Sequence, residues 1–137
     1  MSGDQQMTRS LTHSYYNPNP YIPKKLSEIY DQLGSMLLWA PKFEHVQFPE
    51  QNIDSEFFVL VEGFALIRKK LGEERYSKLI ELAAQAKALF AGDPDDANGK
   101  TDLGRKLLYE IEDIIQEVRG RRQATKLRDE DGEITGD

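Results

Sequence analysis

The sequence predicts an all-α protein: an antiparallel four-helix bundle with an irregular N-terminal segment and a disordered acidic C-terminal tail. Two observations support this fold class. Apolar residues recur at three- and four-residue spacing through four separate stretches, which is the pattern of a helix with one buried face. The breaks between these stretches carry proline, glycine or clustered aspartate, which end helices and favour turns. We therefore predict an N-terminal segment over residues 1–22, a helical bundle over 23–128 and an acidic tail over 129–137.

The first predicted helix begins near Pro23 and ends at about Trp39. Proline is favoured in the first turn of a helix, and Pro41 restricts the residue before it, so the helix must end there. The expected buried face comprises Leu26, Ile29, Tyr30, Leu33, Met36 and Leu37. Gly34 costs about 1 kcal/mol relative to alanine in this helix, and a close crossing with another helix would explain it. We expect Trp39 to belong to the core.

Residues 41–53 lack a helical period and form a predicted connection. The connection is expected to dock through three apolar side chains: Phe43, Val46 and Phe48. The second predicted helix is capped by Asp54 or Ser55 and continues to Leu71. Since residues 57–67 are apolar on almost every side, we expect this helix to be the central and most buried one.

The third predicted helix begins with Glu73 and Glu74, whose charges suit a helix N-terminus, and ends before the loop at residues 92–99. Thr101 is expected to cap the fourth helix, which has the clearest amphipathic pattern in the chain. Its inward residues are Leu103, Leu107, Leu108, Ile111, Ile114, Ile115 and Val118. Beyond Gly120 we expect a fraying, solvated and basic helix end.

Composition excludes several classes of function. The chain has no cysteine, which rules out disulfides, thiol catalysis and thiolate metal sites. Its formal net charge of −6 disfavours a general nucleic-acid binder, because phosphate contacts need clustered positive charge. The sequence has neither an apolar run long enough to span a membrane nor a signal-peptide core, so we expect a cytoplasmic protein without membrane partners. No cofactor is expected, and a homodimer is compatible with the sequence.

The first functional hypothesis is a non-enzymatic protein-interaction module, of the general kind found among immunity proteins, adaptors and inhibitors. An acidic helical surface would meet another protein with a basic surface. The N-terminal segment is rich in tyrosine and proline, as in peptides that dock on a partner or on their own domain. The predicted partner-binding residues are Asp93, Asp95, Asp96, Tyr15, Tyr16 and Tyr21. Weak cation binding by the three aspartates is an alternative.

The second hypothesis is a metal-dependent hydrolase. Glu110, Asp113 and Glu117 lie on one stripe of the fourth helix, at a spacing that suits magnesium ligation. The pair Glu110 and Asp113 resembles one half of the carboxylate motif of MazG-type helical pyrophosphohydrolases, but the second and third helices lack the upstream Glu-x-x-Glu half. Lys106 and Arg121 each lie four residues from a member of the stripe, which favours ordinary surface ion pairs.

The third hypothesis is nucleic-acid binding through the basic end of the fourth helix. Residues 119–128 contain five cations and no acid: Arg119, Arg121, Arg122, Lys126 and Arg128. Acidic residues follow at once and would compete for these cations, so a solvated helix end is the preferred interpretation. Histidine chemistry is not expected, because His13 and His45 have no acid or serine partner at a recognisable spacing.

Overall fold

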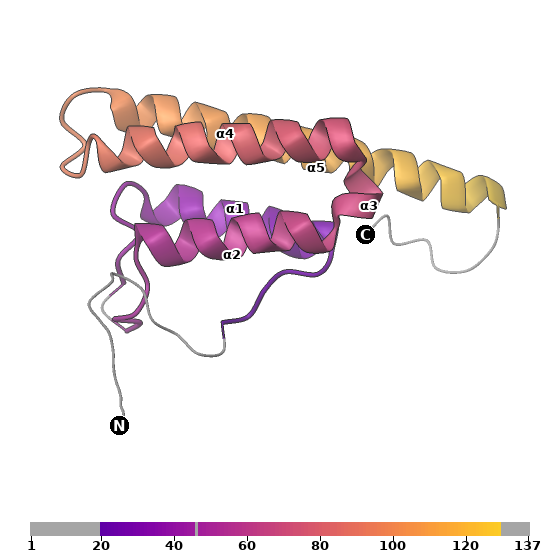
Figure 1. The fold of residues 1–137 in the computed structure, drawn as a ribbon, viewed down its shortest axis with the longest axis horizontal. Helices are drawn as coiled ribbons and strands as arrows, with labels where there is room; N and C mark the ends of the chain where they lie inside the picture. The colour runs from indigo at the N-terminus through magenta and orange to yellow at the C-terminus, as the bar shows by residue number, and fades with distance from the viewer. Residues whose placement is uncertain (1–19, 46, 130–137) are drawn as a thin grey trace.

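The computed structural model describes residues 20–45 and 47–129, and within these ranges the chain is helical and contains no strand (Figure 1). The helices of this part are α1 (Leu26–Trp39), α2 (Ile53–Leu66), α3 (Arg68–Leu71), α4 (Glu73–Ala91) and α5 (Lys100–Asp129). The predicted all-α fold class is confirmed. In the described part of the chain, no helix combines the length and the apolarity that crossing a bilayer requires.

The four longer helices lie side by side and contact one another in a ring (Figure 1). Helix α1 contacts α2, α2 contacts α4, α4 contacts α5, and α5 contacts α1. The core inside this ring receives side chains from every one of these helices, including Leu26, Ile29, Leu33, Met36, Leu60, Phe64, Leu79, Ala83, Ala86, Leu108, Ile111 and Ile115. With 30 residues against 19 in α4, α5 continues past the ends of its neighbours (Figure 1).

The chain enters α1 through an extended segment. Helix α1 begins at Leu26, three residues after the predicted start near Pro23, and the predicted end at Trp39 is confirmed. Pro23 is buried instead against α2, and the carboxylate of Glu28 accepts hydrogen bonds of 2.8 Å from the Tyr21 hydroxyl and the Lys24 backbone N–H. These contacts hold the segment before α1 against the helices.

Helix α2 differs from its prediction at both ends. The Asn52 side chain accepts a hydrogen bond of 2.9 Å from the Ser55 N–H, and the Ser55 hydroxyl accepts one of 2.9 Å from the Asn52 N–H. This reciprocal arrangement is a capping box, so the predicted cap at Asp54 or Ser55 is wrong. The helix also ends at Leu66, and the short helix α3 follows Ile67, so the predicted continuous helix is interrupted.

The predicted burial of α2 on several sides is wrong as well. Phe58 is 44% exposed and Leu66 is 59% exposed. Only one stripe is buried: Ser55, Phe57, Leu60, Gly63 and Phe64. Because each helix of a ring meets neighbours on its inner side alone, apolar residues on the outer side remain in contact with water.

Two glycines permit close packing between helices. A β-carbon added to Gly63 would lie 2.5 Å from the Cδ1 atom of Ile29, and one added to Gly104 would lie 2.7 Å from the ring of Phe90. Both distances are shorter than van der Waals contact allows. Gly34 has no atom within 4 Å of its β-carbon position, so the close crossing suggested there is absent.

Candidate functional site

The aspartates of the loop between α4 and α5 differ sharply in their surroundings. Asp93 is 2% exposed. Its carboxylate accepts hydrogen bonds from three backbone N–H groups, those of Ala97 (2.7 Å), Asn98 (3.2 Å) and Thr101 (3.0 Å). Thr101 lies within the first turn of α5, so the prediction that its side chain caps this helix is wrong. The Asp93 carboxylate satisfies part of the helix N-terminus instead.

The same hydrogen bonds determine the charge of Asp93. Burial raises the pKa of its carboxyl group, but the backbone donors of Ala97, Thr101 and Asn98 together outweigh burial, and the pKa lies below the ordinary value. The ionised carboxylate is therefore engaged inside the loop. Asp95 and Asp96 are exposed, so they are the acidic groups that this loop presents to solvent.

The structure describes one of the three tyrosines predicted to bind a partner. Tyr21 is 61% exposed, and the hydrogen bond from its hydroxyl to Glu28 raises its pKa. Tyr15 and Tyr16 lie outside the described residues.

The carboxylates proposed as metal ligands lie on the outer side of α5. Glu110, Asp113 and Glu117 are all exposed. Glu117 forms an ion pair of 3.3 Å with Arg121 and one of 3.8 Å with Arg75. Across residues 20–45 and 47–129, no three or more His, Asp or Glu side chains are arranged to hold a metal ion. The described contacts of Glu117 are those of a surface ion pair.

The cations of the third hypothesis lie where α5 extends past the other helices. Val118 is the last buried residue in the described part of this helix, whereas Arg119 and Arg122 are half-buried and Arg121 is exposed. Figure 1 shows the helix continuing beyond this point as a projection. We refer to residues 119–129 as the basic arm.

A cluster of aromatic rings in the connection between α1 and α2 escaped the sequence prediction. The rings of Trp39 and His45 meet edge to face at 4.4 Å, and the ring of Phe48 lies 5.0 Å from that of His45. Trp39 is 37% exposed and Phe48 is 49% exposed. The predictions that Trp39 belongs to the core and that Phe48 is a docked anchor are therefore wrong. We refer to Trp39, His45 and Phe48 as the aromatic cluster.

Phe43 anchors the connection that carries this cluster. Its fully buried ring lies 5.7 Å from that of Phe57 and 5.2 Å from that of Phe90. Its backbone φ of 63° falls in the left-handed region, which costs a non-glycine residue about 1–2 kcal/mol. Burial of a phenylalanine ring contributes about 1.5–3 kcal/mol and offsets that cost. The anchor predicted at Phe43 is confirmed, and Val46 lies outside the described residues.

Two further hydrogen bonds order this connection. The guanidinium of Arg105, on α5, donates to the Ala40 carbonyl oxygen at 3.2 Å. The backbone N–H of Gln47 donates to Nδ1 of His45 at 3.0 Å, so a neutral His45 carries its proton on Nε2. The aromatic cluster is thus supported by a tethered backbone rather than by a long unanchored loop.

Two hollows flank the aromatic cluster, and Gln51 lines both. The hollow beside Phe48 measures about 350 Å³, and the one beside His45 measures about 500 Å³. The acidic side chains that line them are Glu44, Glu50 and Glu56, and their described linings include neither lysine nor arginine. The cluster therefore has an acidic rim.

Glu56 is the most enclosed of these rim carboxylates. Burial raises its pKa, while a hydrogen bond of 3.1 Å from the Gln32 side chain lowers it in part, and the pKa remains above the ordinary value. A cation placed nearby would stabilise the ionised form of such a carboxylate and relieve the cost of its burial.

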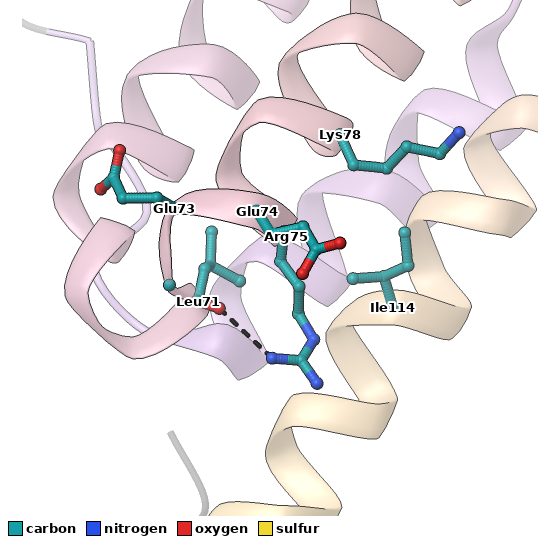
Figure 2. Close-up of a pocket in the computed structure, with 7 residues that line it drawn as sticks. Leu71, Glu73, Glu74, Arg75, Lys78 and Ile114 are labelled. Carbon is teal, nitrogen blue, oxygen red and sulfur yellow. Dashed lines mark hydrogen bonds between the residues drawn. The ribbon is translucent and has the colours of Figure 1, made fainter.

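A further hollow, of about 590 Å³, lies at the start of α4 (Figure 2). Leu71 and Ile114 supply its apolar surface, and Glu74 and Lys78 contribute opposite charges. Figure 2 shows Arg75 reaching across it, with its guanidinium 3.4 Å from the Leu71 carbonyl oxygen. The lining contains two acidic residues, Glu73 and Glu74, and two basic residues, Arg75 and Lys78, so it has no net formal charge to select a ligand.

Comparison with protein-family models finds none that matches the chain, and comparisons with curated proteins and with solved structures find no significant match either. Function must therefore be inferred from the chemistry of the surfaces themselves.

Proposed function

We propose that this protein is a non-enzymatic protein-interaction module and that the aromatic cluster is its contact surface. The observation that carries this proposal is the partial exposure of Trp39 and Phe48 on either side of His45. Tryptophan and other aromatic residues dominate the binding energy of protein interfaces, where each buries a large apolar area with little loss of conformational freedom. The anchored connection adds to this effect, because a surface that is already ordered loses less entropy on binding.

The scaffold of this module is, in our proposal, an antiparallel four-helix bundle made by α1, α2, α4 and α5. The order of contacts around the ring supports this architecture, since helices that follow one another in the chain are also neighbours in space. Arg105 of α5 helps to position the connection by donating a hydrogen bond to the Ala40 carbonyl oxygen, directly after α1.

The acidic rim indicates the chemistry of the partner. An arginine or lysine side chain can lie over an aromatic ring and pair with a carboxylate at the same time. We therefore propose a partner that presents a segment with both basic and apolar residues. This proposal retains the basic partner expected from the sequence, but it places the main contact at the aromatic cluster rather than at Asp95 and Asp96.

Peptide selection on the full-length protein tests the proposal. A random peptide library is selected against the immobilised chain, and the affinities of the recovered peptides are measured by titration calorimetry. We expect arginine-containing peptides with apolar residues, and we expect Trp39→Ala to weaken their binding at least tenfold, which corresponds to about 1.4 kcal/mol. Tyr109→Ala is the matched control, because Tyr109 is a 54% exposed aromatic residue on α5.

Two outcomes would contradict the proposal. One is equal affinity of the selected peptides for the Trp39→Ala variant and the unmodified protein. The other is loss of binding in the double variant Asp95→Lys and Asp96→Lys with retention in Trp39→Ala, which would assign the contact to the acidic loop. Circular dichroism of each variant verifies that the helices are intact.

A further inference from the structure

Another hollow lies between the connection that follows α1 and the loop that precedes α5. It measures about 440 Å³, within the range of about 300–1,000 Å³ that is usual for ligand pockets. Figure 1 shows the connection and the loop at the same end of the helices. We refer to the space between them as the loop hollow.

The loop hollow presents apolar surface that solvent can reach. Pro41 of the connection and Ile53 at the start of α2 line it, and both are half-buried. Ala91, at the end of α4, and Pro94 complete this apolar lining, and both are exposed. A ligand that covered these side chains would remove their surface from water, which is favourable in proportion to the apolar area buried. The loop hollow is therefore suited to an apolar side chain.

Hydrogen bonds hold both walls of the loop hollow in place. On one wall, the guanidinium of Arg105 donates to the Ala40 carbonyl oxygen at 3.2 Å, directly before Pro41. On the other wall, Pro94 directly follows Asp93, whose carboxylate accepts hydrogen bonds from three backbone N–H groups. A binding site that is already ordered loses less conformational entropy when a ligand enters it.

The loop hollow adjoins the surface around the aromatic cluster. Glu44 and Asn52 line both the loop hollow and the hollow beside His45. The hollow beside His45 in turn shares Gln51 with the hollow beside Phe48. A partner segment that covers the aromatic cluster therefore borders the loop hollow as well.

The charges differ between the two ends of this surface. The described linings beside the aromatic cluster contain acidic side chains and neither lysine nor arginine, whereas Lys42 lines the loop hollow. Asp54 also lines the loop hollow, but its carboxylate is 3.0 Å from the ammonium group of Lys87, so its charge is paired. A cation of the partner is therefore attracted to the acidic rim of the aromatic cluster and repelled by Lys42.

We propose that the loop hollow binds an apolar side chain of the same protein partner whose basic residue meets the aromatic cluster. This inference rests on the proposed function, and it adds a second contact and a requirement on the partner's sequence. Because Glu44 borders both spaces, the basic residue and the apolar residue should lie close together in that sequence. Recognition then depends on the pair of residues rather than on the basic residue alone.

Titration calorimetry with one peptide tests the proposal on the full-length protein. The probe is the tightest-binding peptide recovered by selection on the unmodified protein, together with variants in which each of its apolar residues is replaced by alanine. We expect one of these replacements to weaken binding about tenfold or more, as loss of a well-seated side chain does.

Filling the loop hollow should have the same effect from the side of the protein. Ala91→Trp should weaken the original peptide about tenfold or more, and the sensitive peptide position should then tolerate alanine without further loss. Ala84→Trp is the matched control, because Ala84 is an exposed alanine about two turns earlier on the same side of α4. Circular dichroism verifies that the helices are intact. Ala91→Leu places a smaller side chain in the same space and replaces Ala91→Trp if the tryptophan disturbs α4.

Several results would overturn the proposal. Full affinity of Ala91→Trp together with weakened binding by Trp39→Ala would leave the aromatic cluster as the contact surface and exclude the loop hollow. Full affinity of both variants would overturn the proposed function as well. Equal losses in Ala91→Trp and Ala84→Trp would show that the tryptophan acts outside the hollow. A dimer of the unmodified protein that dissociates in Ala91→Trp, measured by analytical ultracentrifugation, would assign the hollow to a second copy of this chain.

Discussion

The carboxylate of Asp93 and the backbone N–H of Thr101 are joined by a hydrogen bond of 3.0 Å that closes the loop between α4 and α5. The Thr101 hydroxyl donates a second hydrogen bond, of 3.2 Å, to the Asp93 carbonyl oxygen. Together these bonds connect Asp93, two residues after the end of α4, with the first turn of α5. Because the carboxylate accepts from several backbone N–H groups, the ionised form of Asp93 is the form that stabilises the loop.

Asp93→Asn should therefore lower the stability of the protein at neutral pH and reduce its sensitivity to acid. The pKa of Asp93 in the folded protein lies below its value in the unfolded chain, which is about 3.9. Its charge thus contributes stability at pH values above the unfolded pKa, and the contribution is lost as the pH falls through the folded pKa. Urea denaturation from neutral pH down to about pH 2 measures this dependence.

Asp95→Asn is the control for that measurement, because Asp95 is exposed in the same loop. It should leave both the neutral stability and the shape of the pH dependence close to those of the unmodified protein. Parallel pH curves for Asp93→Asn and the unmodified protein would contradict the role assigned to the buried carboxylate.

Alanine substitutions at Gly104 and Gly34 should change stability in opposite directions. At Gly104 the added carbon would lie 2.7 Å from the Phe90 ring, and overpacking of this kind costs about 1–3 kcal/mol. At Gly34 the added carbon meets no atom within 4 Å, and replacing an exposed helical glycine by alanine contributes roughly 0.5–1 kcal/mol of stability. Chemical denaturation of the two variants measures both effects, and a change of the same sign in both would argue against the packing described.

Phe43→Ala should destabilise the protein by about 3–5 kcal/mol, which is typical of truncating a buried phenylalanine. The ring fills the space between Phe57 and Phe90, and its removal leaves a cavity at the base of the connection. Phe48→Ala is the comparison, because Phe48 is 49% exposed and its removal should cost much less. Thermal unfolding followed by circular dichroism ranks the two variants, and similar midpoints would mean that Phe43 does not anchor the connection.

Asn52→Ala should cost about 1 kcal/mol through loss of the capping box at α2. Asn52→Asp keeps a side-chain oxygen that can accept from the Ser55 N–H, so this variant should retain most of the stability. Guanidinium denaturation of the pair separates capping from other effects. Equal destabilisation by alanine and aspartate would show that the loss does not arise from the hydrogen-bond-accepting oxygen of the cap.

The sequence by itself determined the features that depend on local rules. The apolar spacing in α1 and α5 predicts their inward faces, and Leu33 and Ile111 are buried as expected, whereas Leu103, also predicted to point inward, is 49% exposed. Pro41 ends the first helix after Trp39, because proline excludes the helical conformation of the residue before it. These features follow from interactions between residues one to four positions apart, which the sequence displays directly.

Only the tertiary structure decided which apolar and acidic residues are covered. Trp39 and Phe48 are partly exposed and Asp93 is buried, although composition suggested the reverse in each case. Burial depends on which side of an element meets a neighbour distant in sequence, as at Gly104, where α5 packs against Phe90 of α4. The hydrophobicity of a side chain sets how much its burial would stabilise the protein. Which side chains are actually buried depends on how segments distant in sequence pack together.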